Sequence, residues 1–207
     1  DCRRFWAKYR AGEIDDEKIE RVESNLATTA GTCAVMGTAS TMACIAEALG
    51  MSLPNTAAIP AVHADRLRAG ENTGTLAVQL VESNLRPSDI ITEKSLENAI
   101  RVLLAIGGST NGIIHLTAIA GRAGINISLK RFNELSDTTP VLLNLKPAGE
   151  HYMEDFHAAG DMEALLRELK PLLHLDCLTV NGETLQERLG VPIREKFDYT
   201  IVHKLNQ

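Results

Sequence analysis

One segment of the chain places a cysteine among small side chains directly before a predicted helix. Cys33 lies between Gly31 and Gly37, and apolar periodicity predicts a helix from Thr38 to about Leu49. The N–H groups at a helix N-terminus stabilise a thiolate or an anion, and small neighbours let a bulky group approach. By frequency alone, a cysteine packed as a small hydrophobe is about three times as common as a ligand. The spacing therefore leaves both roles open for Cys33.

A second segment places three polar residues, Ser109, Thr110 and Asn111, after two glycines in a turn between two apolar helical patterns. Such a turn can hold a carboxylate or a phosphate through its backbone donors. The same residue types are also preferred at helix N-caps, and that structural interpretation is favoured about two to one. His115, one turn further on, is more typical of a core or edge histidine than of a catalytic one.

Three further groups of residues have a simpler structural explanation. Residues 60–66 include His63, Asp65 and Arg66, which are typical of a capped helix start with a local ion pair. Residues 151–157 combine two histidines with two acids, but a solvated helix start is about four times as common as a metal site. The remaining cysteines show neither CxxC spacing nor a disulfide framework, and they are interpreted as structural: Cys2, Cys44 and Cys177.

These candidate residues must be positioned by helices, because helical periodicity dominates the chain. Helices are predicted over residues 15–26, 38–49, 64–84 (interrupted near Gly70 and Gly74), 96–104 and 162–173. Short apolar runs predict strands over residues 57–62, 141–145, 177–180 and 199–202. This alternation predicts an α/β class, a helix-rich layered domain with a small sheet. One domain spanning residues 1–207 is the default, with a possible break near Ser136–Pro140.

The composition narrows the class of partner. With 44% hydrophobic and 23% charged residues, the chain is typical of a globular domain. A net charge of -6 argues against nucleic acid as a partner, because phosphate binding needs clustered Lys and Arg. We find no apolar stretch of membrane-spanning length and no signal-peptide core in Asp1–Arg10. We therefore expect a cytoplasmic protein with a small-molecule substrate and no membrane contact.

Taken together, the segments resemble the dihydroxy-acid and sugar-acid dehydratase family, in an order and spacing that cover nearly the whole chain. The resemblance rests on Arg4–Gly12, the Cys33 segment, Ala46–Gly50, the turn at Gly107–Asn111 with His115–Leu116, Tyr152–Asp155 and Leu178–Gly182. Family members are considerably longer. The resemblance therefore implies that residues 1–207 are an internal fragment of the N-terminal, cluster-binding domain, cut at both ends, and that this fragment alone is inactive.

The resemblance also implies roles for the candidate residues. It makes Cys33 one of three ligands of an iron–sulfur cluster, with 2Fe-2S favoured over 4Fe-4S, which reverses the odds stated above. Thr38, Ser109, Thr110 and Asn111 would surround the substrate or the cluster. The catalytic base, the other cluster cysteines and the ligands of Mg²⁺ would lie outside this chain. The implied reaction is a β-elimination, in which a base removes the C2 proton, an iron accepts the C3 hydroxyl and a 2-keto acid forms.

The branch of the family is predicted from two stretches, Met36–Met42 and Ala57–Val62, which are more similar to the sugar-acid dehydratases. The branched-chain amino-acid enzyme tends to have an aromatic residue where Gly37 stands. His63 and Asp161 depart from the sugar-acid pattern, which often has Asp and Gly there. A sugar acid such as a pentonate is thus the expected substrate, and a homo-oligomer (dimer or tetramer) the expected assembly. The alternatives are a dihydroxy-acid dehydratase of branched-chain amino-acid synthesis and a non-catalytic binding or assembly module.

Overall fold

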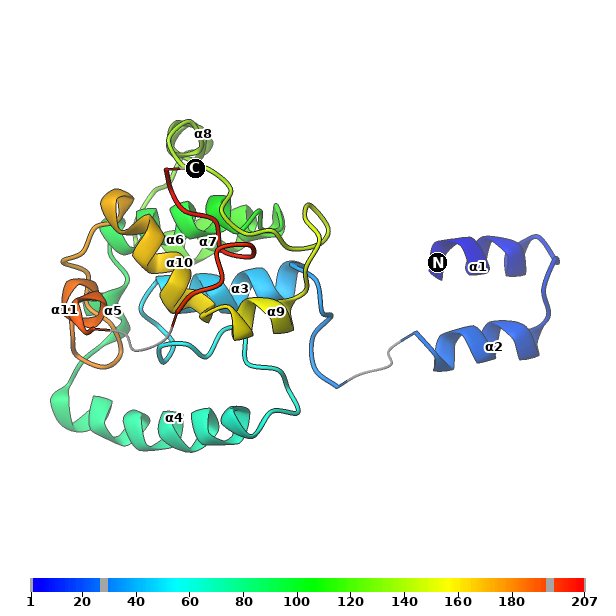
Figure 1. Cartoon of the computed structure of the whole chain (residues 1–207), viewed down its shortest axis with the longest axis horizontal. Helices are drawn as coiled ribbons and strands as arrows, with labels where there is room; N and C mark the ends of the chain where they lie inside the picture. Colours follow the sequence, from blue (N-terminus) through cyan, green and yellow to red (C-terminus); the bar gives the residue numbers. More distant parts are fainter. Residues whose placement is uncertain (1, 27–29, 193–195, 207) are drawn as a thin grey trace. The chain divides into compact units, whose positions relative to one another are not determined.

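The computed structural model describes residues 2–26, 30–192 and 196–206, and the chain divides into two compact units at Gly31/Thr32 (Figure 1). The break considered near Ser136–Pro140 is wrong, because Leu135 before it and Leu142 after it belong to one hydrophobic core. Among the helices described, none combines the length and the apolar character that a bilayer crossing requires.

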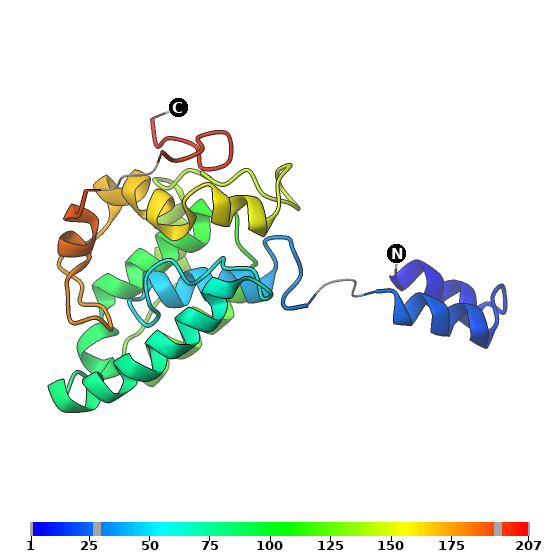
Figure 2. The same ribbon diagram turned by 60° about the horizontal axis from the view of Figure 1, so that its bottom comes forward.

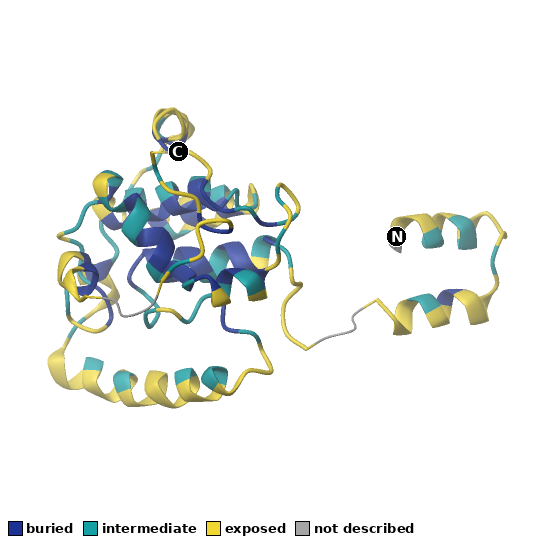
Figure 3. Cartoon of the chain, in the orientation of Figure 1, coloured by how far each residue is buried: buried dark blue, intermediate teal, exposed yellow. Residues whose placement is uncertain are grey.

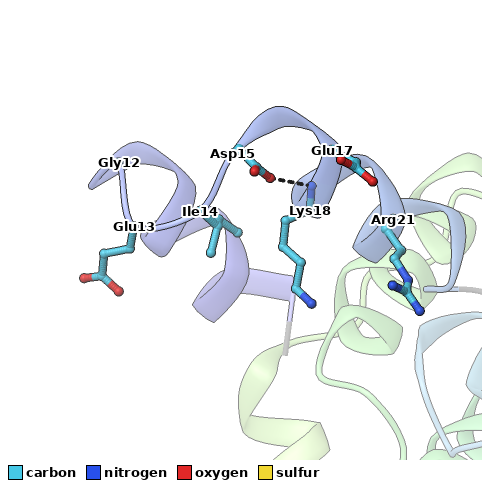
Figure 4. A pocket seen from close by; sticks show the side chains of 7 residues that line it. All are labelled: Gly12, Glu13, Ile14, Asp15, Glu17, Lys18 and Arg21. Carbon is cyan, nitrogen blue, oxygen red and sulfur yellow. Dashed lines mark hydrogen bonds between the residues drawn. The ribbon is translucent and has the colours of Figure 1, made fainter.

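Unit 1, residues 1–31, contains α1 (Cys2–Arg10) and α2 (Asp16–Ser24), which pack against each other. The hydroxyl group of Tyr9 donates to Asp16 Oδ1 at 2.7 Å, and Ile19 is buried. Helix α2 begins at its cap Asp15, whose carboxylate accepts from the backbone N of Lys18 at 2.8 Å (Figure 4). The predicted helix over residues 15–26 is thus confirmed with an earlier end. The hollow drawn in Figure 4 contains none of the predicted site residues.

Unit 2, residues 32–207, is organised around α6 (Glu93–Ala105), which packs against three other helices (Figure 2). These are α3 (Thr38–Ala48), α7 (Asn111–Arg122) and α8 (Leu129–Ser136). The later part of the unit contains α9 (Met153–Ala158), α10 (Asp161–Leu169), the 3-10 helix η1 (Lys170–Leu172) and α11 (Leu185–Gly190). Their buried faces form one core, visible as dark blue on α3, α6 and α10 in Figure 3. The helical stripes predicted over residues 38–49, 96–104 and 162–173 are confirmed.

Helix α4 (Ala64–Ser83) runs for 20 residues and contains no buried residue (Figure 3). The predicted interruption near Gly70 and Gly74 does not occur. A glycine inside a helix lowers its stability by about 1 kcal/mol, which is too little to interrupt a helix of this length. A side chain added at either glycine would meet open space, so neither glycine is required by packing. The helix ends at Asn84, in the left-handed region with φ 55°, and α5 (Pro87–Ile90) follows.

The small sheet predicted from the sequence is wrong, because the structure contains isolated bridges and no strand among the residues that it describes. The bridges join Leu143 with Val202, Leu145 with His151, and Leu178 with Thr184. Backbone groups of the apolar runs bond instead to helix ends, as where Leu142 N donates to Ala105 O at 2.7 Å, at the end of α6. The runs are apolar because they cover the helical core. The described fold is therefore all-helical rather than α/β.

A buried ion pair ties α3 to α11. Arg188 Nη2 donates to Glu47 Oε1 at 2.7 Å, and the two side chains are 5% and 0% exposed. The same carboxylate accepts backbone N–H groups of Asn55 and Ala57 at 2.8 and 3.2 Å. Burial raises the pKa of Glu47, and the Arg188 guanidinium opposes this rise. Within the described residues, Arg188 Nε is buried without a hydrogen-bond partner.

Candidate functional site

Cys33 lies in the loop that leads into α3, with an exposed, free thiol. The helix begins at Gly37, an N-cap with no side chain to cover the helix end. A Cβ atom built on Gly37 would lie 3.2 Å from Cys33 Sγ, so the sulfur is immediately beside this end. The first N–H groups of a helix have no intrahelical acceptor and form the positive end of its dipole. The sulfur of Cys33 therefore lies beside backbone N–H donors that have no partner within the helix.

The loop that contains Cys33 is held by the segment before α9. Met36 N donates to Lys146 O at 2.8 Å, and Met153 N donates to Ala34 O at 2.8 Å. The hydroxyl group of Ser40 reaches back to Val35 O at 3.2 Å. The backbone on both sides of the cysteine is thus fixed, while its thiol remains exposed.

Hydrogen bonds join the start of α3 to the turn before α7. Thr38 Oγ1 lies 3.0 Å from Ser109 Oγ, and Asn111 Nδ2 donates to Thr38 Oγ1 at 2.9 Å. The backbone N of Ser109 donates to Thr41 Oγ1 at 3.0 Å. Three residues predicted as neighbours of a substrate or cluster therefore meet in one network. Thr41 belongs to it as well and was missed, although it lies one turn after Thr38 on the same helix.

The glycines of this turn permit its close approach to the core. A Cβ atom on Gly108 would lie 2.8 Å from Leu103 Cδ1 and 2.9 Å from Thr41 Cγ2. Gly107 has φ +58°, a conformation that favours glycine. Packing thus favours glycine at position 108, and the backbone conformation favours glycine at position 107. Together the two glycines set the position of Ser109.

Thr110 and His115 do not join the network. Thr110 is the N-cap of α7 without a side-chain capping bond, and its side chain is exposed. His115 is exposed on the first turns of α7. The proposed role of Thr110 near a ligand therefore stays a prediction.

The other described cysteines lie in surroundings unlike that of Cys33. Cys44 is fully buried, and burial raises the pKa of its thiol well above the usual value. Burial also raises the pKa of Cys177 to about 11. Both fit the predicted structural role, and the side chain of Cys2 lies outside the described residues. Among the cysteines that the structure describes, Cys33 is thus the one with an exposed thiol.

Comparison with known proteins places these residues in a wider family. Residues 1–188 match the family described as Dihydroxy-acid/6-phosphogluconate dehydratase N-terminal. Dihydroxy-acid dehydratase of Caldanaerobacter subterraneus subsp. tengcongensis is 46% identical over 182 residues, 87% of this chain and 33% of that protein. Dihydroxy-acid dehydratase 1 of Methanosarcina acetivorans is 48% identical, with the same coverage of each chain. The enzyme of Caldicellulosiruptor saccharolyticus is 46% identical over 96% of this chain. The chain spans about a third of the length of these relatives.

Proposed function

Because the chain belongs to the dihydroxy-acid/6-phosphogluconate dehydratase N-terminal family, we propose that it is part of a dihydroxy-acid dehydratase, a hydro-lyase. The observation that carries this proposal is the pair of hydrogen bonds between Thr38 and the turn at Ser109–Asn111. Thr38 begins the helix that follows the exposed thiol of Cys33. Ordered hydroxyl and amide groups near an exposed thiol can serve a polar substrate at a metal centre.

In this proposal Cys33 is one protein ligand of an iron–sulfur cluster, preferably 2Fe-2S. When bound, the cluster would supply a Lewis-acidic iron for the departing hydroxyl group. The helix end at Gly37 would stabilise the sulfur as a ligand, and the missing side chain of Gly37 leaves room beside it. Ser109, Thr110 and Asn111 would orient the substrate or the surroundings of the cluster. The base and the Mg²⁺ ligands would be supplied from outside this chain, and we expect the 207-residue chain alone to be inactive.

The substrate proposed here is the 2,3-dihydroxy acid of branched-chain amino-acid synthesis rather than a sugar acid. The relatives quoted above carry the name dihydroxy-acid dehydratase, which supports this alternative over the first expectation. Two positions, His63 and Asp161, depart from the sugar-acid pattern. Both are neighbours of His157: the centroids of the His63 and His157 rings are 5.6 Å apart, and Asp161 Oδ2 lies 3.0 Å from His157 Nδ1. The stretch at Gly37 remains the sequence feature in favour of a sugar acid.

The test uses the complete enzyme that contains this chain. We expect Cys33→Ser to abolish both the visible absorbance of the cluster and dehydration. Cys177→Ser is the matched control, because that half-buried thiol is predicted to be structural, and it should retain iron. Survival of cluster absorbance per protein in Cys33→Ser would contradict the ligand assignment.

The substrate is tested separately with the wild-type enzyme. We expect a higher kcat/KM for dihydroxyisovalerate than for pentonates, measured by formation of the 2-keto acid. The reverse preference would restore the sugar-acid assignment while leaving the role of Cys33 intact.

A further inference from the structure

Three potential metal ligands, two from the start of α4 and one from α9, lie close together in unit 2. One ligand atom each from His63, Asp65 and His157 lies within 4.8 Å of the other two. His63 is the N-cap of α4, Asp65 is in its first turn, and His157 is in α9. The rings of the two histidines are 5.6 Å apart between centroids. These residues take no part in the hydrogen-bond network of Thr38, Ser109 and Asn111.

His63 and Asp65 place two potential ligand atoms side by side. His63 Nδ1 accepts from the backbone N of Asp65 at 3.2 Å, and it also lies 3.2 Å from Asp65 Oδ2. A ring nitrogen and a carboxylate oxygen therefore face each other at a distance that one bound cation could bridge.

The Asp65 carboxylate has one oxygen engaged and one directed to this group. Arg68 Nε donates to Asp65 Oδ1 at 2.7 Å. That bond orients the carboxylate so that Oδ2 is the atom nearest to His63 Nδ1. The arginine thus fixes the ligand without occupying its second oxygen.

His157 is oriented in the way that protein metal ligands usually are. Its Nδ1 lies 3.0 Å from Oδ2 of Asp161, whose side chain is 4% exposed, and this leaves Nε2 as the free ring nitrogen. A carboxylate behind the second ring nitrogen fixes the tautomer of a metal-binding histidine and raises its basicity. Asp161 also has φ 53°, a backbone conformation in which Asp is tolerated less well than Gly. A carboxylate is therefore held at a glycine-favouring position, directly behind His157.

We propose that His63, Asp65 and His157 bind one divalent transition-metal ion of the Zn²⁺ class, with Asp161 as the positioning residue of His157. Two nitrogens and one carboxylate oxygen are a typical ligand set for Zn²⁺, with water in the fourth position. Ligands about 2.1 Å from a tetrahedral ion are roughly 3.4 Å apart, so a pair of ligand atoms within 4.8 Å must close by at most about 1.4 Å. His63 has a side chain that is 48% exposed and can make this adjustment.

The site would anchor a helix that the core does not hold. Helix α4 has no buried residue, whereas α9 carries the buried Met153 and Phe156. A metal ion shared by His63, Asp65 and His157 would tie the beginning of α4 to α9. The proposal does not depend on the enzymatic activity proposed above.

The experiment titrates the 207-residue chain carrying Cys33→Ser with Co²⁺, so that the exposed thiol cannot bind the metal. We expect one equivalent with the visible bands of a four- or five-coordinate ion, which Zn²⁺ displaces. His63→Ala and His157→Ala should each weaken binding at least about tenfold, and Asp161→Asn about 10- to 100-fold. His115→Ala removes an exposed histidine from α7 and should change nothing.

A second measurement does not rely on the optical signal. In hydrogen exchange, Zn²⁺ should slow the exchange of the amides of residues 64–83 in the parent chain and leave them unchanged in His157→Ala. Circular dichroism of each variant verifies that its helices are retained. Absence of saturable binding, or equal binding in the His63, His157 and parent proteins, would overturn the proposal and identify the group as a histidine–aspartate ion pair.

Discussion

Asn111 donates its side-chain amide to Thr38 Oγ1 at 2.9 Å, and this bond links the starts of α7 and α3 across 73 positions of sequence. Ser109 completes the contact through its hydroxyl group, 3.0 Å from the same oxygen. Two segments that were identified independently by residue type are thus one structural feature. Small shifts in either helix start would change the position of the other relative to Cys33.

Asn111→Ala should reduce turnover of the complete enzyme more than it reduces stability. The loss of one exposed hydrogen bond lowers stability by about 1 kcal/mol, whereas a displaced polar group at a reacting centre can lower the rate about 100-fold. Steady-state kinetics and thermal unfolding measure the two effects. Thr117→Ala on the same helix is the matched control, and equal losses of efficiency in both variants would show that Asn111 has only a structural role.

The cysteines should be alkylated in a fixed order. In a Cys2→Ser background, iodoacetamide at pH 8 should modify Cys33 first, because its thiol is exposed. Cys177, with a pKa of about 11, holds about one part in a thousand as thiolate at this pH, and Cys44 is buried. Peptide mass spectrometry measures the order. Faster labelling of Cys177 than of Cys33 would contradict the surroundings described for both.

Two glycines of the same region should respond in opposite directions to alanine. Gly108→Ala places a Cβ atom 2.8 Å from Leu103 Cδ1 and should lower the free energy of unfolding by about 1–3 kcal/mol. Gly121, in α7, has open space around it, and Gly121→Ala should raise stability by about 0.5–1 kcal/mol. Urea unfolding measures both. A neutral Gly108→Ala would mean that the turn can move away from the core.

The contribution of Glu97 to stability should depend on pH. Burial raises the pKa of Glu97, but hydrogen bonds from His174 and Arg131, at 2.9 and 2.7 Å, outweigh it, so the pKa lies below its usual value. A lowered pKa in the folded state stabilises the fold above the pKa of the unfolded chain, about 4.3, and this stabilisation is lost as pH falls through the folded value. The Tm difference between wild type and Glu97→Gln should therefore be largest near pH 6 and shrink below pH 4. A difference that is constant over this range would contradict the assignment.

The helices of the core could be predicted from the sequence because their apolar faces repeat at helical spacing, as at Leu96, Ile100 and Leu103 in α6. Composition alone could not distinguish strands from irregular apolar segments that pack over the helical core. Runs such as Val141–Leu145 have the composition of strands, yet their backbone partners are single residues and a helix end. Local composition does not specify those partners, and this made the predicted fold class wrong.

The residues of the candidate site were found from their types, but their arrangement was not. Thr38, Ser109 and Asn111 were selected from two separate segments, and no local pattern showed that they share hydrogen bonds. The sequence around His63 predicts a helix cap, and the bond from Asp65 N to the His63 ring confirms it. Its second partner, His157, comes from another helix, and only the folded chain brings it near.

The ion pair between Glu47 and Arg188 has a consequence for the order of events on the ribosome. The two residues are 141 positions apart, and each is buried. Removing one partner of a buried pair costs about 3–5 kcal/mol, a large part of the stability of a domain of this size. While α11 is still within the exit tunnel, Glu47 has no guanidinium to neutralise it. The interior around α3 therefore closes only after Arg188 has emerged from the tunnel.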